Sequence, residues 1–149
     1  MKSTLVLLAA LVIPSAFAEP PAEVMNIVRE SEVQWTPSRF SPGLQTAVIS
    51  GNPANPGQPY VVRVKFSPGN FSPPHFHPET RYIVVLKGTW WVGSGPKFDP
   101  DHGTVPMPAG SFVTHYGKQV HWDGAKDEDA VLLITGEGPA TSTLVAEEK

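Results

Sequence analysis

Prolines and glycines interrupt this chain at short intervals, and this limits its possible folds more than any other feature. Because proline breaks helices and interior strands, the 17 prolines and 13 glycines keep the regular elements between them short. The intervening segments are rich in β-branched and aromatic residues, which favour strands. The predicted strands cover residues 33–36, 44–49, 60–66, 81–86, 89–92, 111–116 and 130–135. Short strands at regular spacing predict an all-β sandwich or barrel.

One of these segments shows how the strands are buried. Val62, Val64 and Phe66 alternate with Arg63 and Lys65. Successive side chains of a strand point to opposite faces, so the apolar set faces a core and the basic pair faces solvent. The pattern therefore predicts sheets with one buried face.

The connections are also predictable in part. Residues 50–59 are rich in turn residues and predict a long hairpin loop, and Gly88 is suited to a tight turn with positive φ. Residues 106–110 are interpreted as a turn, residues 22–32 as a short helix, and the chain after Thr143 as a frayed tail.

Residues 1–18 have the pattern of a secretory signal peptide. Lys2 supplies the positive start, residues 5–13 form an apolar stretch, and residues 16–18 match the small-residue cleavage rule. The apolar stretch is shorter than the roughly 20 residues that span a bilayer. We therefore expect cleavage after residue 18, export to the periplasm or beyond, and one mature domain over residues 19–149.

Charge and cysteine content exclude several classes of partner and site. The formal net charge is −3 and there is no basic cluster, so nucleic acid is not an expected partner. No further apolar segment is long enough to hold the mature chain in a membrane. The chain has no cysteine, which excludes disulfides and thiolate metal sites. Any metal site must use histidine, carboxylates or water.

Two of the five histidines, His75 and His77, are one residue apart. On an extended chain this spacing places both imidazoles on one face, where they can grip a divalent ion. Pro73, Pro74 and Pro78 stiffen the chain around the pair. The alternative interpretation is a polar strand edge with no ligand.

The chain resembles a small single-domain cupin. The first cupin motif is G-x5-H-x-H-x(3,4)-E-x6-G, and every interval is present here in Gly69, His75, His77, Arg81 and Gly88. Only the glutamate is replaced, by Arg81.

The second cupin motif, G-x5-P-x-G-x2-H-x3-N, has the same intervals in this chain. Gly110 and His121 match it. Tyr116 stands at the proline position, Lys118 at the glycine and Ala125 at the asparagine.

The resemblance implies a fold and a site. The fold would be the cupin-type double-stranded β-helix, a jelly-roll barrel. By motif position, His75, His77 and His121 would converge inside it and bind one divalent metal ion, which could be iron, manganese, nickel, zinc or copper. A small-molecule ligand or substrate and a homodimer formed through an outer sheet are further implications.

Arg81 replaces the glutamate whose carboxylate binds the metal in the cupin motif. A guanidinium has no lone pair to offer a metal. Three placements are open. Arg81 turns away and pairs with Glu79 or a surface carboxylate, it points inward and binds an anionic substrate beside the ion, or the site has lost its metal and binds an organic ligand. Glu79, two residues after His77, is also a candidate replacement ligand.

No catalytic residue can be assigned, but three are candidates. They are Arg81, His115 and Tyr116. The last two are neighbours on a predicted strand, so they point in opposite directions and one of them is expected to line the barrel. His102 lies in a polar loop and is interpreted as solvated.

Two functional predictions remain open. The first is a periplasmic metal-binding cupin enzyme that acts on a small organic molecule by dioxygenation, isomerisation or hydrolysis. The second is a non-enzymatic small-ligand-binding or sensing module, with or without metal. The residues alone do not decide whether the chain is an enzyme.

Overall fold

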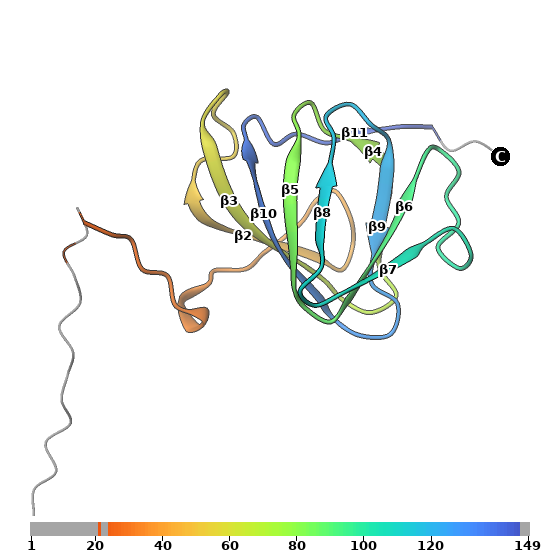
Figure 1. Ribbon diagram of the computed structural model, residues 1–149, viewed down its shortest axis with the longest axis horizontal. Coiled ribbons are helices and arrows are strands. Elements are labelled where there is room, and N and C mark those ends of the chain that lie inside the picture. Colours follow the sequence, from red (N-terminus) through yellow and green to blue (C-terminus); the bar gives the residue numbers. More distant parts are fainter. Residues whose placement is uncertain (1–20, 22–23, 147–149) are drawn as a thin grey trace, which may run out of the picture.

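The structure is a computed structural model that describes residue 21 and residues 24–146. These residues form two antiparallel sheets packed face to face (Figure 1). The predicted signal peptide, residues 1–18, lies outside the described residues, and its cleavage stays a prediction. In the part of the chain that the structure describes, no helix is long and apolar enough to cross a membrane.

The first sheet has six strands in the order β1-β2-β3-β10-β5-β8. The strands are β1 (Thr36–Pro37), β2 (Leu44–Gly51), β3 (Pro59–Phe66), β10 (Ala130–Glu137), β5 (Arg81–Lys87) and β8 (Phe112–His115). The second sheet has five strands in the order β11-β4-β9-β6-β7. They are β11 (Thr143–Leu144), β4 (Phe71–Phe76), β9 (His121–Gly124), β6 (Thr89–Ser94) and β7 (Val105–Pro108). From β3 to β11 the chain crosses repeatedly between the sheets, which confirms the predicted jelly roll.

The hydrophobic core fills the space between the sheets. Ile83 from β5, Trp90 from β6 and Leu132 from β10 have no exposed surface. Val64 and Phe66 join the same cluster, as the alternation in β3 predicted.

The opposite face of β3 is turned outward. Arg63 and Lys65 lie over the Trp35 ring, with the guanidinium carbon and Nζ 5.4 and 5.2 Å from its centroid. The apolar and basic sets therefore face opposite sides, as predicted. Gly88 also has the predicted positive φ, of 70°, in the turn from β5 to β6.

Three local predictions were wrong. Of the predicted helix over residues 22–32, residues 22 and 23 lie outside the described residues, and residues 24–32 contain only one 3₁₀ turn, η1 (Glu30–Glu32), flanked by extended backbone at Arg29 and Val33. Most of the predicted turn 106–110 belongs to β7, which pairs with β6. The chain after Thr143, predicted to be frayed, pairs with β4 at Leu144, and residues 147–149 of that tail lie outside the described residues.

Two further strands, β4 and β9, were missed because their sequences do not resemble strands. Strand β4 contains Pro73 and Pro74, which cannot donate to a sheet ladder, and its pairing with β9 shifts register between Ser72 and His75. Strand β9 carries His121 and Asp123 on one face in place of apolar residues. Both strands contribute to the candidate site.

Candidate metal centre

The barrel brings His75, His77 and His121 together. His75 and His77 are only 3% and 4% exposed, and the register of β4 with β9 sets His121 directly opposite His75. The three ring centroids are 4.5–5.1 Å apart. One strand pairing therefore joins histidines that lie more than forty residues apart in the sequence.

Each of the three rings places Nδ1 against a backbone carbonyl oxygen. The contacts are His75 to Pro73 at 2.7 Å, His77 to Thr141 at 2.8 Å and His121 to Gln119 at 3.0 Å. A carbonyl oxygen only accepts hydrogen bonds, so Nδ1 carries the proton in each ring. The lone pair is consequently on Nε2 in all three. Such carbonyl contacts orient metal-binding histidines in other proteins.

The three Nε2 atoms face one another. Those of His75 and His77 are 3.1 Å apart, and the donor atoms of all three rings lie within 4.8 Å of one another. The Nε2 atom of His121 is buried without a hydrogen-bond partner. Two lone pairs cannot hydrogen-bond to each other, so a cation between them is the natural partner. Two imidazole nitrogens that each lie about 2 Å from a shared ion are separated from each other by a distance close to that between the Nε2 atoms of His75 and His77. The residues therefore fit a divalent metal.

Burial keeps these imidazoles neutral. Desolvation, together with the charge of Arg81, lowers the pKa of His77 from 6.5 to about 2. Desolvation, together with His75, lowers the pKa of His121 to about 3. Desolvation also lowers the pKa of His75 and of His115. The neutral form is the one that binds metal ions.

We expect the metal-free protein to lose stability as the pH falls from 7 to 5.5. In the unfolded chain histidine gains its proton near pH 6.5, whereas His77 and His121 stay neutral in the fold down to about pH 2 and 3. The unfolded state then binds more protons, so each such histidine adds a slope of up to about 1.4 kcal/mol per pH unit below pH 6.5. Urea unfolding of chelator-treated protein measures this.

His77→Gln tests the origin of this pH dependence. Because it removes one buried imidazole, it should flatten the dependence between pH 7 and 5.5. A wild-type stability that does not change over this range would contradict neutral buried imidazoles.

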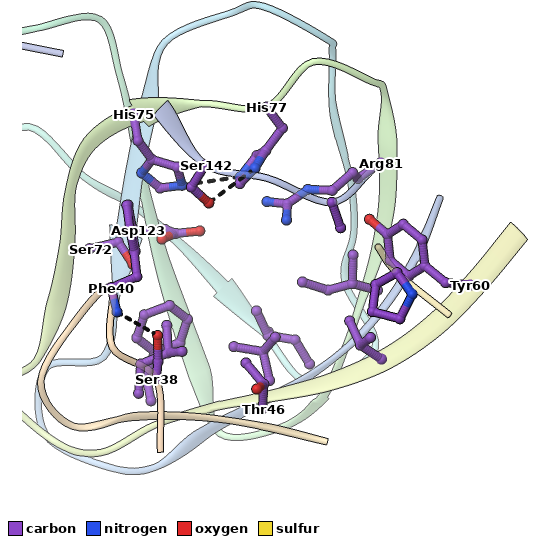
Figure 2. A pocket seen from close by; sticks show the side chains of 18 of the residues that line it. Ser38, Phe40, Thr46, Tyr60, Ser72, His75, His77, Arg81, Asp123 and Ser142 are labelled. Carbon is purple, nitrogen blue, oxygen red and sulfur yellow. Dashed lines mark hydrogen bonds between the residues drawn. The ribbon is translucent and has the colours of Figure 1, made fainter. Parts of the chain in front are cut away.

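Arg81 points into the barrel from β5. Its side chain lines the central cavity, and Figure 2 shows the guanidinium directed between His77 and Tyr60. Glu79 is exposed, and no ion pair of Arg81 is present within the described residues. The outward placement of Arg81 paired with Glu79 is therefore wrong, and Glu79 does not join the histidines.

Asp123 is the main site residue that sequence reasoning missed. It lies two residues after His121 on β9, is buried on the same side of the strand, and lines the cavity with His75 and Arg81. Burial raises the pKa of Asp123, while the charge of Arg81 acts in the opposite direction. The H-x-D spacing was the available signal, since it places both side chains on one face of a strand.

His115 and Tyr116 point in opposite directions, as predicted. His115 is buried with its ring centroid 3.8 Å from that of His121, and its Nδ1 has no hydrogen-bond partner. Tyr116 is 68% exposed. A second set of donor atoms, from His115, His121 and Asp123, also lies close enough together to hold an ion. His115 is cross-strand neighbour to Arg81, so an imidazole from β8 stands beside the position of the missing glutamate.

A cavity of about 450 Å³ opens beside the histidines. Polar side chains, including His75, His77, Arg81 and Asp123, line one side of it (Figure 2). The remaining wall is largely aliphatic and includes Leu44, Val48, Val62, Val64, Leu132 and Ile134. A small organic molecule in this space would lie against the candidate metal site.

One departure from the second motif has a structural explanation. Lys118 has φ of 64°, a conformation that the glycine usual at this position adopts more easily. Its backbone N–H donates to the His77 carbonyl oxygen at 2.7 Å. The turn before His121 is therefore retained without glycine and is fastened to the first motif.

The jelly roll and its convergent imidazoles define a cupin. The chain belongs to the ChrR cupin-like domain family, whose model matches residues 23–141. Germin-like protein 4-1 of Oryza sativa subsp. japonica is 30% identical in an alignment of 112 residues, with 69% of this chain and 40% of that protein covered. Germin-like protein subfamily 1 member 7 of Arabidopsis thaliana is 31% identical in an alignment of 110 residues, with 69% of this chain and 43% of that protein covered. The chain thus spans about two fifths of these relatives.

Solved structures confirm the fold. The polyketide cyclase RemF from Streptomyces resistomycificus superposes with a TM-score of 0.69 at 18% identity, covering 84% of this chain and 88% of that one. The DMSP lyase DddQ from Ruegeria pomeroyi DSS-3 gives a TM-score of 0.62 at 17% identity, and the match covers 80% of this chain and 64% of that one. At these identities the likeness is one of fold.

Proposed function

We propose that this cupin is a metal-dependent enzyme that acts on a small organic molecule in the central cavity. The observation that carries the proposal is the set of three Nε2 lone pairs, each oriented by a backbone carbonyl, that converge beside that cavity. Two structural neighbours are named as a polyketide cyclase and a lyase, and both names fit small-molecule chemistry on this fold. Export and pairing into a homodimer stay predictions from the sequence.

The residues around the cavity support proton-transfer chemistry. A divalent ion held by the three imidazoles would supply Lewis-acid polarisation of a substrate oxygen. Asp123, whose pKa is raised by burial, can accept and return a proton on the same cavity wall. This arrangement favours isomerisation or hydrolysis over dioxygenation, and an enzyme over a module that only binds.

Elemental analysis of protein purified without a histidine tag tests the proposal. We expect close to one divalent ion per chain, and turnover of a substrate that stops on chelation and returns with the ion. A folded protein that takes up no iron, manganese, nickel, zinc or copper on titration would contradict it.

Arg81→Glu should tighten metal binding by about tenfold or more. The change removes a cation directed toward the site and supplies a carboxylate that can act as a ligand. Competition with a chromogenic chelator measures the dissociation constant. Arg81→Gln is the matched variant, because it removes the charge without adding a strong ligand and should give a smaller gain. Equal affinities for the two variants would show that this position does not reach the ion.

A further inference from the structure

The geometry points to an anion subsite, formed by Arg81 and Tyr60, that binds the carboxylate of a substrate whose remaining part is small and apolar. This inference rests on the proposed function, because it places the substrate in the same cavity. It adds a substrate class and a binding role for two named residues.

The first support is the unbalanced charge of Arg81. Its Nε atom is buried without a hydrogen-bond partner, and no carboxylate in residues 24–146 forms an ion pair with it. A guanidinium stays protonated in proteins, so the charge persists in the fold. A buried charge without a partner is costly, and a ligand that supplies the opposite charge removes that cost.

Tyr60 provides the second support. It comes from β3, is 2% exposed, and its hydroxyl interacts with the Arg81 side chain and has no other partner in the described residues. Burial raises the pKa of Tyr60 above its ordinary value of 10, so the hydroxyl keeps its proton and can donate it in a hydrogen bond. Figure 2 shows the Tyr60 hydroxyl turned toward the Arg81 side chain, whose guanidinium extends into the cavity.

The charged side chains that line the cavity favour an anionic ligand. The lining includes two cationic side chains, Arg39 and Arg81, and one acidic residue, Asp123. A divalent ion on the three imidazoles would make the cavity more positive still, which favours an anionic ligand over a neutral or cationic one.

The shape of the cavity and the hydrogen-bond donors of Arg81 and Tyr60 favour a carboxylate ligand with an apolar body. A guanidinium matches the two oxygens of a carboxylate in a bidentate pair, and Tyr60 adds one further donor. The wall opposite is largely aliphatic, with Leu44, Val62, Val64 and Ile134, and its polar members are Ser38, Arg39 and Thr46, none of them acidic. The volume of about 450 Å³ limits the body to a small one.

Calorimetric titration with matched probes tests the subsite. Hexanoate and benzoate are compared with hexanamide and benzamide, which share their shape but carry no charge. We expect wild-type protein to bind each carboxylate at least tenfold more tightly than its amide. Arg81→Gln should abolish this preference, and Tyr60→Phe should weaken carboxylate binding severalfold. Arg63→Gln, the same change on the outer face of β3, should keep it.

The inference is overturned if the amides bind wild-type protein as tightly as the carboxylates, or if Arg81→Gln retains the preference. Thermal unfolding of each variant identifies any that fail to fold, and the wild-type comparison of acid with amide stands without them. Metal content, measured on the same samples, separates the two proposals. A metal-loaded protein without carboxylate preference refutes the subsite alone, and a carboxylate-selective protein that takes up no metal refutes the metal-dependent function alone.

Discussion

Replacement of His77 or His121 by alanine is expected to lower bound metal from about one ion per chain to less than about a tenth of that. Each change removes one of three oriented imidazoles, and two remaining donors form an incomplete site. Both side chains are buried, so water entering the space replaces the lost ligand poorly. Elemental analysis after dialysis measures the loss, and titration with the metal measures the weakened dissociation constant.

Two further histidines serve as controls for this result. His102→Ala should leave metal content unchanged, because that ring is exposed in a loop beside Asp99. His115→Ala distinguishes the two overlapping sets of donors, since His115 belongs only to the set with His121 and Asp123. The assignment of the site would be refuted if His77→Ala and His121→Ala both kept a full complement of metal.

Trp90→Ala should destabilise the fold by about 3–5 kcal/mol, the cost of truncating a large core aromatic. Trp90 has no exposed surface, and its ring centroid lies 5.4 Å from that of His115. The cavity left behind would border both the core and the histidine cluster. Urea unfolding gives the loss in free energy, and near-ultraviolet circular dichroism reports whether the core stays ordered.

The neighbouring tryptophan is the matched control. Trp91 points to the opposite face of β6, where Nζ of Lys126 lies 4.0 Å from its ring centroid. Trp91→Ala should cost about 1 kcal/mol, because it removes a partly solvated cation–π contact in place of core packing. Equal losses for the two variants would contradict the placement of Trp90 in the core.

Most of the scaffold was predictable because its strands follow ordinary rules. Strand β3 alternates apolar and basic residues, and that pattern alone identified its buried face. Strands β4 and β9 do not follow the rule, since one contains two prolines and the other directs a histidine and a carboxylate inward. The strands hardest to predict are those that carry the site, because polar groups replace apolar ones there.

The site itself was predictable only where its residues are close in the chain or match a motif. The spacing of His75 and His77 placed them on one face, and the cupin resemblance added His121. Tyr60 carried no comparable signal, because it is an ordinary strand residue until the register of the sheets brings it to the cavity. The H-x-D spacing of His121 and Asp123 becomes a signal only once this segment is known to be a strand. The direction of Arg81 was likewise undecided, because either side of β5 could have received it.

The hydrogen bond from His77 to Thr141 joins residues 64 positions apart and fixes which nitrogen of the ring is free. Residues 141–144, which include β11 paired with β4, therefore take part in the geometry of the site although they contribute no imidazole. A chain shortened to end before residue 141 would keep the carbonyl contacts that orient His75 and His121 but would lose the one that orients His77.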